Sequence, residues 1–292
     1  MFRVVNKQIL GKDVRRLDVI AWDVAKKFQP GQFVMVKVEE HGEKIPLEII
    51  EADLYRGSIA LIFQEKGPAT EKLGQLQIND AIFSILGPLG QPAVIEKIGI
   101  VVCVAHGVDV APLLPICRGF KRLGNKTLGI IGADTKKELI LEAQMRVACH
   151  KILITTEDGS YIRKGTVLSA LRETIDQEKV NLVYCIGDID LMQDVSELTK
   201  QKKIKTVVHL NPVMIDGIGV CGSCRVKVGG QTLLACVDGP EFDAHQVDFK
   251  DLKIRMKTLK ESGKCCEKTS TSSQKTKGSK TLERFLSAVL KK

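Results

Sequence analysis

The run Asp216-Gly-Ile-Gly-Val-Cys221-Gly-Ser-Cys224 is followed, after eleven residues, by Cys236. Its spacing is the C-x4-C-x2-C…C frame of a loop that binds a 2Fe–2S cluster, with a carboxylate in the place of the first thiolate. Three glycines inside the run give the loop the freedom to fold around a cluster and to point N–H groups at its sulfides. The sequence therefore predicts a 2Fe–2S site with these four ligands, and electron transfer as the chemistry.

Two other interpretations of these residues stay open. A structural zinc also uses Cys-x2-Cys and can accept an aspartate, but zinc sites usually pair two short Cys or His knuckles, and the second knuckle is missing here. Asp216 is the least secure ligand, because oxygen is a harder donor than sulfur and a lone aspartate in a glycine-rich loop is often a turn residue.

Cysteine usage indicates a reducing compartment. The chain has nine cysteines, no apolar segment after Met1 that resembles a signal peptide, and no run near the ~18 apolar residues that span a bilayer. We therefore expect a cytoplasmic protein without a transmembrane segment. Four cysteines lie in apolar stretches and are expected to be free core thiols: Cys103, Cys117, Cys149 and Cys185. The adjacent Cys265 and Cys266 receive no role.

The net charge of +9 is concentrated at one end. Residues 264–292 hold seven Lys and one Arg against two Glu, which is +6 and leaves only +3 for the preceding 263 residues. A nucleic-acid-binding protein would place basic and aromatic residues on a folded face, whereas aromatics are only 4% of this chain. We expect no nucleic-acid partner.

Hydrophobic patterns divide the 292 residues into successive regions. Residues 1–95 alternate apolar and polar positions, as in 32–38, which predicts a small antiparallel β-barrel. From 96 to 211, short apolar strands alternate with helical stretches such as 111–123 and 136–148, which predicts a doubly wound parallel sheet. The cluster domain follows at 212–255. The fold class is thus α/β plus β.

The last region, 256–292, is predicted to be a linker that ends in an amphipathic helix. Residues 268–280 contain no large apolar residue, whereas Leu282, Phe285, Leu286 and Val289 recur at helical spacing. A short helix is marginal alone, so it must dock on another surface. We favour docking of 279–292 on a partner subunit; the chain's own body and a membrane surface are the alternatives.

Several segments carry a resemblance to a known family. They are Gln29–Phe33, Gly87–Gly90, Thr155–Ser160, Leu210–Gly217, Ala235–Asp243 and His245–Phe249. Together they resemble the small subunit of NADH-dependent ferredoxin:NADP oxidoreductase, also called the sulfide dehydrogenase beta subunit, in the ferredoxin–NADP reductase superfamily. The electron-transfer subunit of dihydroorotate dehydrogenase is a relative with cysteine at the first ligand position, so Asp216 favours the former branch.

The resemblance implies that FAD lies between barrel and sheet, that NAD(H) docks at the sheet, and that the cluster relays electrons to a larger flavin and iron–sulfur subunit. The flavin motif corresponds to Pro46, Leu47 and Glu48, where a carboxylate stands in place of the family's hydroxyl. The phosphate turn corresponds to Gly67, Ala69 and Thr70, in which Pro68 removes one N–H donor.

The nucleotide motif departs from the family pattern. The family's Gly-Gly-Gly-x-Gly turn is Ala105-His106-Gly107-Val108-Asp109 here, so only Gly107 is retained. Aspartates also replace the usual Arg at 134 and the usual Pro at 188. Asp134 alone could select NAD by binding a ribose hydroxyl, but three acidic residues at strand ends should repel an anionic dinucleotide. We expect weak or lost binding of pyridine nucleotide.

Two functional interpretations follow. The chain is either a relay that passes single electrons through the cluster, with FAD retained and the nucleotide site weakened or lost, or an active NADH-oxidising FAD and 2Fe–2S reductase subunit. A structural assembly role in the same complex is a further alternative. The resemblance favours the active reductase, the lost glycines favour the relay, and we prefer the relay.

Overall fold

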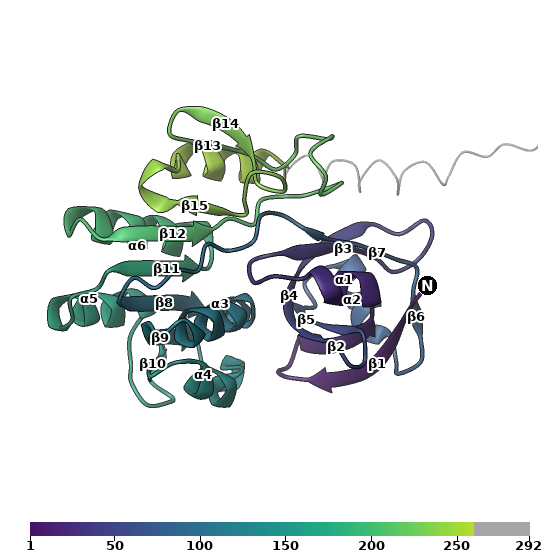
Figure 1. The fold of residues 1–292 in the computed structure, drawn as a ribbon, viewed down its shortest axis with the longest axis horizontal. Helices are drawn as coiled ribbons and strands as arrows, with labels where there is room; N and C mark the ends of the chain where they lie inside the picture. Colours follow the sequence, from purple (N-terminus) through teal and green to yellow (C-terminus); the bar gives the residue numbers. More distant parts are fainter. Residues whose placement is uncertain (260–292) are drawn as a thin grey trace, which may run out of the picture. The chain divides into compact units, whose positions relative to one another are not determined.

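The computed structural model describes residues 1–259, of which Met1–Leu252 form one compact unit (Figure 1). The expected linker 268–280, the docking helix 279–292 and Cys265 and Cys266 lie outside the described residues. Within the described part of the chain, no helix is long and apolar enough to cross a membrane. The proposed domain boundaries at 95, 211 and 255 remain predictions.

The N-terminal region forms a seven-stranded antiparallel sheet with the order β6-β1-β2-β5-β4-β3-β7. Alternate residues of its strands fill one shared apolar core, which includes Val4, Leu17, Val34 and Leu61. This confirms the predicted barrel-like sheet. Its strands are β1 (Phe2–Ile9), β2 (Val14–Ile20), β3 (Phe33–Lys37), β4 (Lys44–Asp53), β5 (Ser58–Gln64), β6 (Ala81–Ile82) and β7 (Ser84–Leu89), and its helices are α1 (Trp22–Lys27) and α2 (Pro68–Gln75).

The second region is a parallel sheet with the order β10-β9-β8-β11-β12, as the strand and helix alternation predicted. Its strands are almost continuously apolar because helices cover both faces. The strands are β8 (Ile100–His106), β9 (Lys126–Ala133), β10 (Lys151–Thr156), β11 (Leu182–Ile186) and β12 (Lys205–His209). The helices are α3 (Val110–Arg122), α4 (Glu142–Ala148), α5 (Val167–Gln177) and α6 (Ile189–Gln201).

The expected helix over 136–148 is broken in the structure. A single 3-10 turn at Lys136–Glu138 is followed by an extended segment and then by α4. Leu141 has a positive φ of 56°, which ends helical propagation at that point. The apolar Ile140 and Leu141 are buried in the core beside α3, so tertiary packing overrides local helix propensity.

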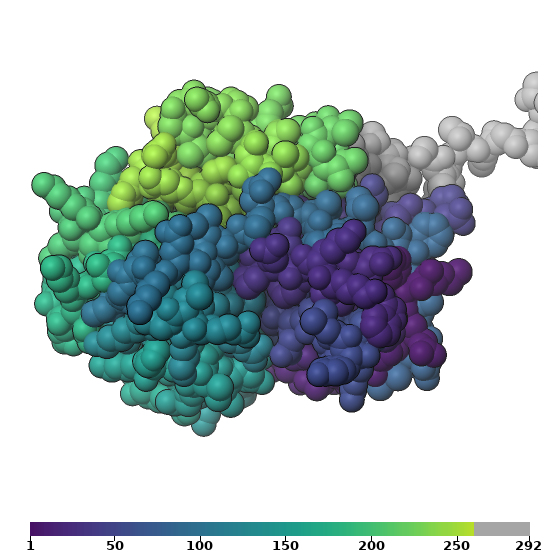
Figure 2. All heavy atoms as spheres, viewed as in Figure 1, coloured from purple at the N-terminus to yellow at the C-terminus, as the bar shows by residue number. Residues whose placement is uncertain are grey.

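The cluster segment attaches to the sheet instead of standing apart from it. After the hairpin of β13 (Arg225–Val228) and β14 (Gln231–Leu234), strand β15 (Glu241–Asp243) pairs antiparallel with β12. Gln91 ties this segment to the connection that follows the barrel, because its backbone N–H donates to Gly239 O (2.7 Å) and its side chain to Val237 O (2.8 Å). Figure 2 shows the yellow-green cluster segment packed directly on the blue and teal residues.

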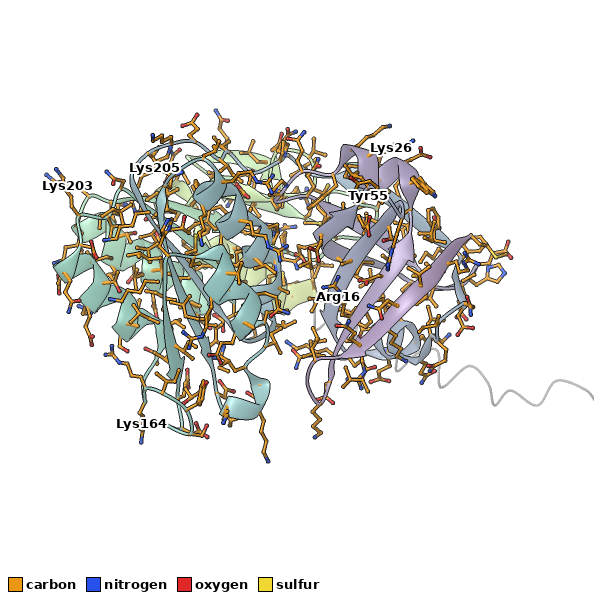
Figure 3. All side chains as sticks on the ribbon, turned by 60° about the horizontal axis from the view of Figure 1, so that its bottom comes forward. Arg16, Lys26, Tyr55, Lys164, Lys203 and Lys205 are labelled. Atoms are coloured by element: carbon orange, nitrogen blue, oxygen red, sulfur yellow. The ribbon has the colours of Figure 1, made fainter. Side chains whose placement is uncertain are left out.

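The barrel and the sheet share an apolar core and an ion-pair bridge. Ile50 of β4 and Ile62 of β5 are buried among the residues of α3. Glu51 then accepts hydrogen bonds from Arg16 (3.2 Å) and from Arg118 on α3 (3.1 Å). Arg16 points from the barrel toward the sheet in Figure 3. These contacts hold the carboxyl ends of the parallel strands against the barrel, where the candidate sites lie.

Candidate functional site

The β13–β14 hairpin brings two predicted cluster ligands together. Cys224 directly precedes β13 and Cys236 follows β14, and the N–H of Ala235 donates to Cys224 O (3.1 Å), which extends the ladder by one step. The two Sγ atoms are 3.2 Å apart and both side chains are buried. Burial and the neighbouring Cys224 thiol raise the pKa of Cys236 to about 12. A metal would therefore displace protons as it binds this pair.

The other two predicted ligands lie together on the solvent side of the loop. The Asp216 carboxylate accepts hydrogen bonds from the N–H of Ile218 (2.9 Å) and of Cys221, which hold its pKa below the ordinary value. Partial burial raises the pKa of the exposed Cys221 thiol, but hydrogen bonds from the Ser223 hydroxyl (3.1 Å) and N–H (3.5 Å) bring it below its ordinary value. These donors would stabilise a thiolate ligand.

The spread of the four donors fits a two-metal cluster better than one zinc ion. Sulfur ligands of one tetrahedral zinc lie about 3.8 Å apart, since each Zn–S bond is ~2.3 Å. Among the described residues, the four donor atoms do not gather within 4.8 Å of one another. The Cys224 and Cys236 pair is close enough to share one iron, which leaves the Asp216 and Cys221 pair for the second.

Glycine is required in this loop for conformation and for space. Gly217 and Gly219 have φ values of 75° and 85°, in the left-handed region that side chains rarely adopt. A Cβ on Gly217 would lie 2.5 Å from Met35 Cγ, and one on Gly219 would lie 2.7 Å from Val237 Cγ2. The loop therefore packs directly on barrel strand β3 through Met35.

The predicted flavin motif lies on β4, next to β3. In register with that strand, Pro46 pairs with Met35, while Leu47 is buried in the barrel core. Glu48 points the other way and accepts a hydrogen bond from Asn211 Nδ2 (3.2 Å), with His209 Nε2 at 3.5 Å. The structure thus places the Pro46–Glu48 segment between the cluster loop and the end of the sheet.

The sequence analysis did not single out His209 and Asn211, which contact Glu48 in the structure. His209 is 3% exposed, and its Nδ1 is buried without a hydrogen-bond partner among the described residues. His209 is the last residue of β12 and Asn211 comes shortly after it, at the carboxyl end where ligands of doubly wound sheets bind. Their position at the carboxyl end of a strand was the sequence signal that could have identified them.

The turn Gly67–Thr70 is a helix start. Thr70 Oγ1 accepts hydrogen bonds from the N–H of Lys66 (3.0 Å) and of Gly67 (3.1 Å), and Pro68 occupies the first position of α2. Both backbone donors are used locally, so this arrangement corresponds to an N-terminal cap. Ala69 lines a different cavity, near Glu39, so the three predicted phosphate-turn residues do not share a cavity with Gly107.

A cleft of about 420 Å³ lies between the barrel and the carboxyl ends of the parallel strands, and we call it the strand-end cleft. Gly107 lines it with a φ of 60° and with open space at its Cβ position. All three acidic residues singled out from the sequence, Asp109, Asp134 and Asp188, line the same cleft. The predicted convergence of these strand ends is therefore observed.

Two of these aspartates, Asp109 and Asp188, have different environments. Burial, followed by the negative charge of Glu48, raises the pKa of Asp109 to about 6. Asp188 caps α6 by accepting a hydrogen bond from the N–H of Leu191 (2.7 Å), so the helix start stabilises its charge. Three lysines also line the cleft: Lys12, Lys66 and Lys137. The cleft is acidic but contains cations that could face a phosphate.

A buried polar pair lies between the sheet and the cluster segment. The hydroxyl of Tyr184, on β11, donates to the Glu241 carboxylate on β15, and burial raises the pKa of Glu241. Glu241 also faces His209 in the β12–β15 register. No local pattern signals this pair, because its members are far apart in the sequence.

Comparison with known proteins agrees with this arrangement. Residues 211–248 match the iron–sulfur cluster binding domain of dihydroorotate dehydrogenase B. An uncharacterized protein of Clostridium beijerinckii is 38% identical over 274 residues, covering 90% of this chain and 93% of that protein. A homologue of the dihydroorotate dehydrogenase B (NAD(+)) electron transfer subunit from Thermotoga maritima is 34% identical over 261 residues, covering 89% and 92%.

The fold also matches solved structures. A chain in the structure of NADH-dependent reduced ferredoxin-NADP oxidoreductase, determined in connection with flavin-based electron bifurcation, superposes with a TM-score of 0.86. It is 33% identical, and the match covers 92% of this chain and 97% of that chain. A cytochrome P450 reductase from Amycolatopsis, 18% identical with a TM-score of 0.59, shares the fold alone.

Proposed function

Because the chain belongs to the family of dihydroorotate dehydrogenase B electron-transfer subunits and their homologues, we propose that it relays single electrons through a 2Fe–2S cluster bound between Asp216 and Cys236. It is an electron-transfer subunit of a flavin and iron–sulfur oxidoreductase. When bound, FAD exchanges electrons singly or in pairs and the cluster passes them one at a time. The chain's own contribution is to position both groups.

One observation carries the proposal. The cluster loop touches Met35 of β3 through Gly217, and Met35 pairs with Pro46 of the predicted flavin motif on β4. The candidate flavin segment and the candidate cluster loop are therefore separated by a single β-strand. Electron transfer between two groups needs such proximity on a rigid support.

We further propose that the chain's own pyridine nucleotide site is weakened. Ala105, His106 and Asp109 replace glycines that would let backbone N–H groups approach a pyrophosphate. Asp134 and Asp188 add negative charge to the same cleft. The alternative, an active NADH-oxidising subunit, is favoured by the lysines that line this cleft.

An anaerobic titration of the purified chain with NADH distinguishes the relay from the active reductase. Visible absorption at the flavin and cluster bands follows the titration. The relay predicts cluster bands that respond to dithionite but not to NADH. Bleaching of both bands by NADH would support the active reductase and overturn the proposed loss of the nucleotide site.

Ligand substitutions test the cluster itself. Cys221→Ser and Cys236→Ser should each abolish the cluster absorption, and Asp216→Ala should weaken it, because each removes an iron ligand. Val220→Ala is the matched control, since Val220 lies in the same loop, is 81% exposed and supplies no ligand. Unchanged iron content in either cysteine variant would contradict the assignment.

We propose a larger flavin and iron–sulfur subunit as the partner, in the cytoplasm. Ile218 and Val220 in the cluster loop, and Val237 beside Cys236, are exposed apolar residues. Such residues around a redox site are suited to contact with another protein. The buried free thiols Cys103 and Cys185 are consistent with a reducing compartment.

A further inference from the structure

Three potential metal ligands lie at the carboxyl ends of three adjacent parallel strands. His106 is the last residue of β8, and Asp134 and Glu157 directly follow β9 and β10. Their donor atoms all lie within 4.8 Å of one another. We propose that His106, Asp134 and Glu157 form a binding site for a divalent transition-metal cation. This proposal is independent of the cluster and of the proposed relay function.

The backbone holds the three residues in place. In the sheet register His106 pairs with Gly132, and Ala133 pairs with Thr156, so the ends of the three strands are aligned. The pairing continues beyond the strands, because the N–H of Glu157 donates to Ala133 O and the N–H of Asp158 donates to Asp134 O, both at 3.2 Å. A site built on strand ends in this way is rigid before any ligand arrives.

The distances suit a single ion. His106 Nε2 lies 3.4 Å from Asp134 Oδ1 and 3.9 Å from Glu157 Oε1. Nitrogen and oxygen donors bound to one cation at ~2.1 Å lie about 3.0 to 3.4 Å apart, depending on whether the geometry is octahedral or tetrahedral. The first pair is already at this separation, and a small rotation of the exposed Glu157 side chain would bring the second to it.

An unsatisfied nitrogen points into the group. His106 Nε2 has almost no accessible surface and no hydrogen-bond partner among residues 1–259. Thr155 Oγ1, in a residue that is 1% exposed, is also unpartnered. The two side chains flank Gly132 on one face of the sheet, because a Cβ there would lie 2.9 Å from Thr155 Oγ1 and 3.3 Å from His106 Cδ2. A buried polar atom without a partner is destabilising, and a cation on Nε2 would supply the missing partner.

Asp134 and Glu157 pair with no cationic side chain other than His106 in the described part of the chain. Within residues 1–259, neither Asp134 nor Glu157 forms an ion pair with a lysine or arginine. Lys164, in the segment that follows β10, points away from the body of the protein (Figure 3). One imidazole cannot balance two carboxylates, and solvent-exposed ion pairs stabilise a protein only weakly. A divalent cation would balance both charges.

The donor set selects the class of ion. One imidazole nitrogen and two carboxylate oxygens suit Mn²⁺, Fe²⁺, Co²⁺ or Zn²⁺, whereas the thiols of the cluster loop suit softer ions. Asp134 and Glu157 are 67% and 51% exposed, and His106 and Asp134 line the strand-end cleft. The remaining coordination positions would therefore be open to water or to an oxygen ligand such as a phosphate. A cation here would neutralise the local charge of Asp134 and Glu157 that otherwise repels anions.

Mn²⁺ is the appropriate probe, because it has little preference for thiols and its free form gives an electron paramagnetic resonance signal that is lost on binding. The full chain, dialysed against metal-free buffer, should bind one equivalent of Mn²⁺. Asp134→Asn and Glu157→Gln should each weaken binding by roughly tenfold or more, and His106→Gln should do the same.

Glu138→Gln is the matched control, since it removes an equal charge from the same cleft without touching the three donors. It should leave Mn²⁺ binding unchanged. Circular dichroism checks the fold of each variant, and the two exposed carboxylate variants carry the test if His106→Gln does not fold. Absence of saturable Mn²⁺ binding by the wild-type chain, or equal binding by all three ligand variants, would overturn the proposal.

Discussion

Replacement of Asp109 by asparagine should stabilise the protein at neutral and alkaline pH. Burial, followed by the charge of Glu48, raises the pKa of Asp109 from 3.8 to about 6, while Lys66 and His209 oppose the shift. A raised pKa means that the folded state prefers the protonated acid, so this preference is fully present below pH 3.8 and is lost as the pH rises through about 6. At about 1.4 kcal/mol per pKa unit, ionisation costs up to about 3 kcal/mol at pH 8.

The Asp109→Asn variant avoids this cost because its side chain has no charge to bury. The side chain is partly accessible to solvent, so we expect a gain of about 1 to 2 kcal/mol at pH 8. The gain should fall to about half near pH 5, where much of the wild-type Asp109 is protonated in the folded state. Urea unfolding followed by far-ultraviolet circular dichroism at pH 8 and pH 5 measures both values, with chelator present to exclude divalent cations.

Glu138→Gln is the control for this experiment as well. It removes a negative charge from the same cleft, but its side chain is exposed, so the free energy of unfolding should change by less than about 0.5 kcal/mol. Equal stability of Asp109→Asn and the wild type at pH 8 would refute the reasoning. A gain of the same size at pH 5 and pH 8 would refute it too, because the effect would then not come from ionisation.

The remaining predictions concern the cluster loop, the buried polar pair and the cleft. Gly217→Ala should lower cluster content more than Gly222→Ala: both glycines have positive φ, at a cost of about 1 kcal/mol for alanine, but only the former would clash with Met35. Iron content per chain measures the difference, and equal losses would contradict it. Tyr184→Phe should lower the free energy of unfolding by about 1 to 3 kcal/mol in urea, because it removes the hydroxyl donor of the buried Glu241 side chain and leaves the backbone bond from Val94. Mn²⁺ should strengthen the binding of NADH in a fluorescence titration, and an NADH affinity that is independent of Mn²⁺ would show that the cation does not meet the phosphates.

Features that depend on short stretches of sequence could be predicted. The barrel-like sheet and the doubly wound sheet follow from local periodicity, since alternation and continuous apolar runs report which faces of a strand are buried. The cluster-binding segment could also be predicted, because its four candidate ligands come from one loop and one hairpin with the spacing typical of such a group. The assignment of Asp216, Cys221, Cys224 and Cys236 as ligands stays a prediction. The break in the helix over 136–148 could not, because it depends on where Leu141 packs.

The sequence by itself therefore determined the fold class, the family resemblance and the presence of an iron–sulfur cluster binding segment. Only the tertiary structure decided which distant polar residues meet. Glu48 meets His209 across the barrel and sheet boundary, and Tyr184 meets Glu241 between two strands of the sheet. His106 and Asp134 converge because β9 lies beside β8 in the sheet. Strand order and register bring such residues together, and both are set by packing of the whole chain instead of by any local pattern.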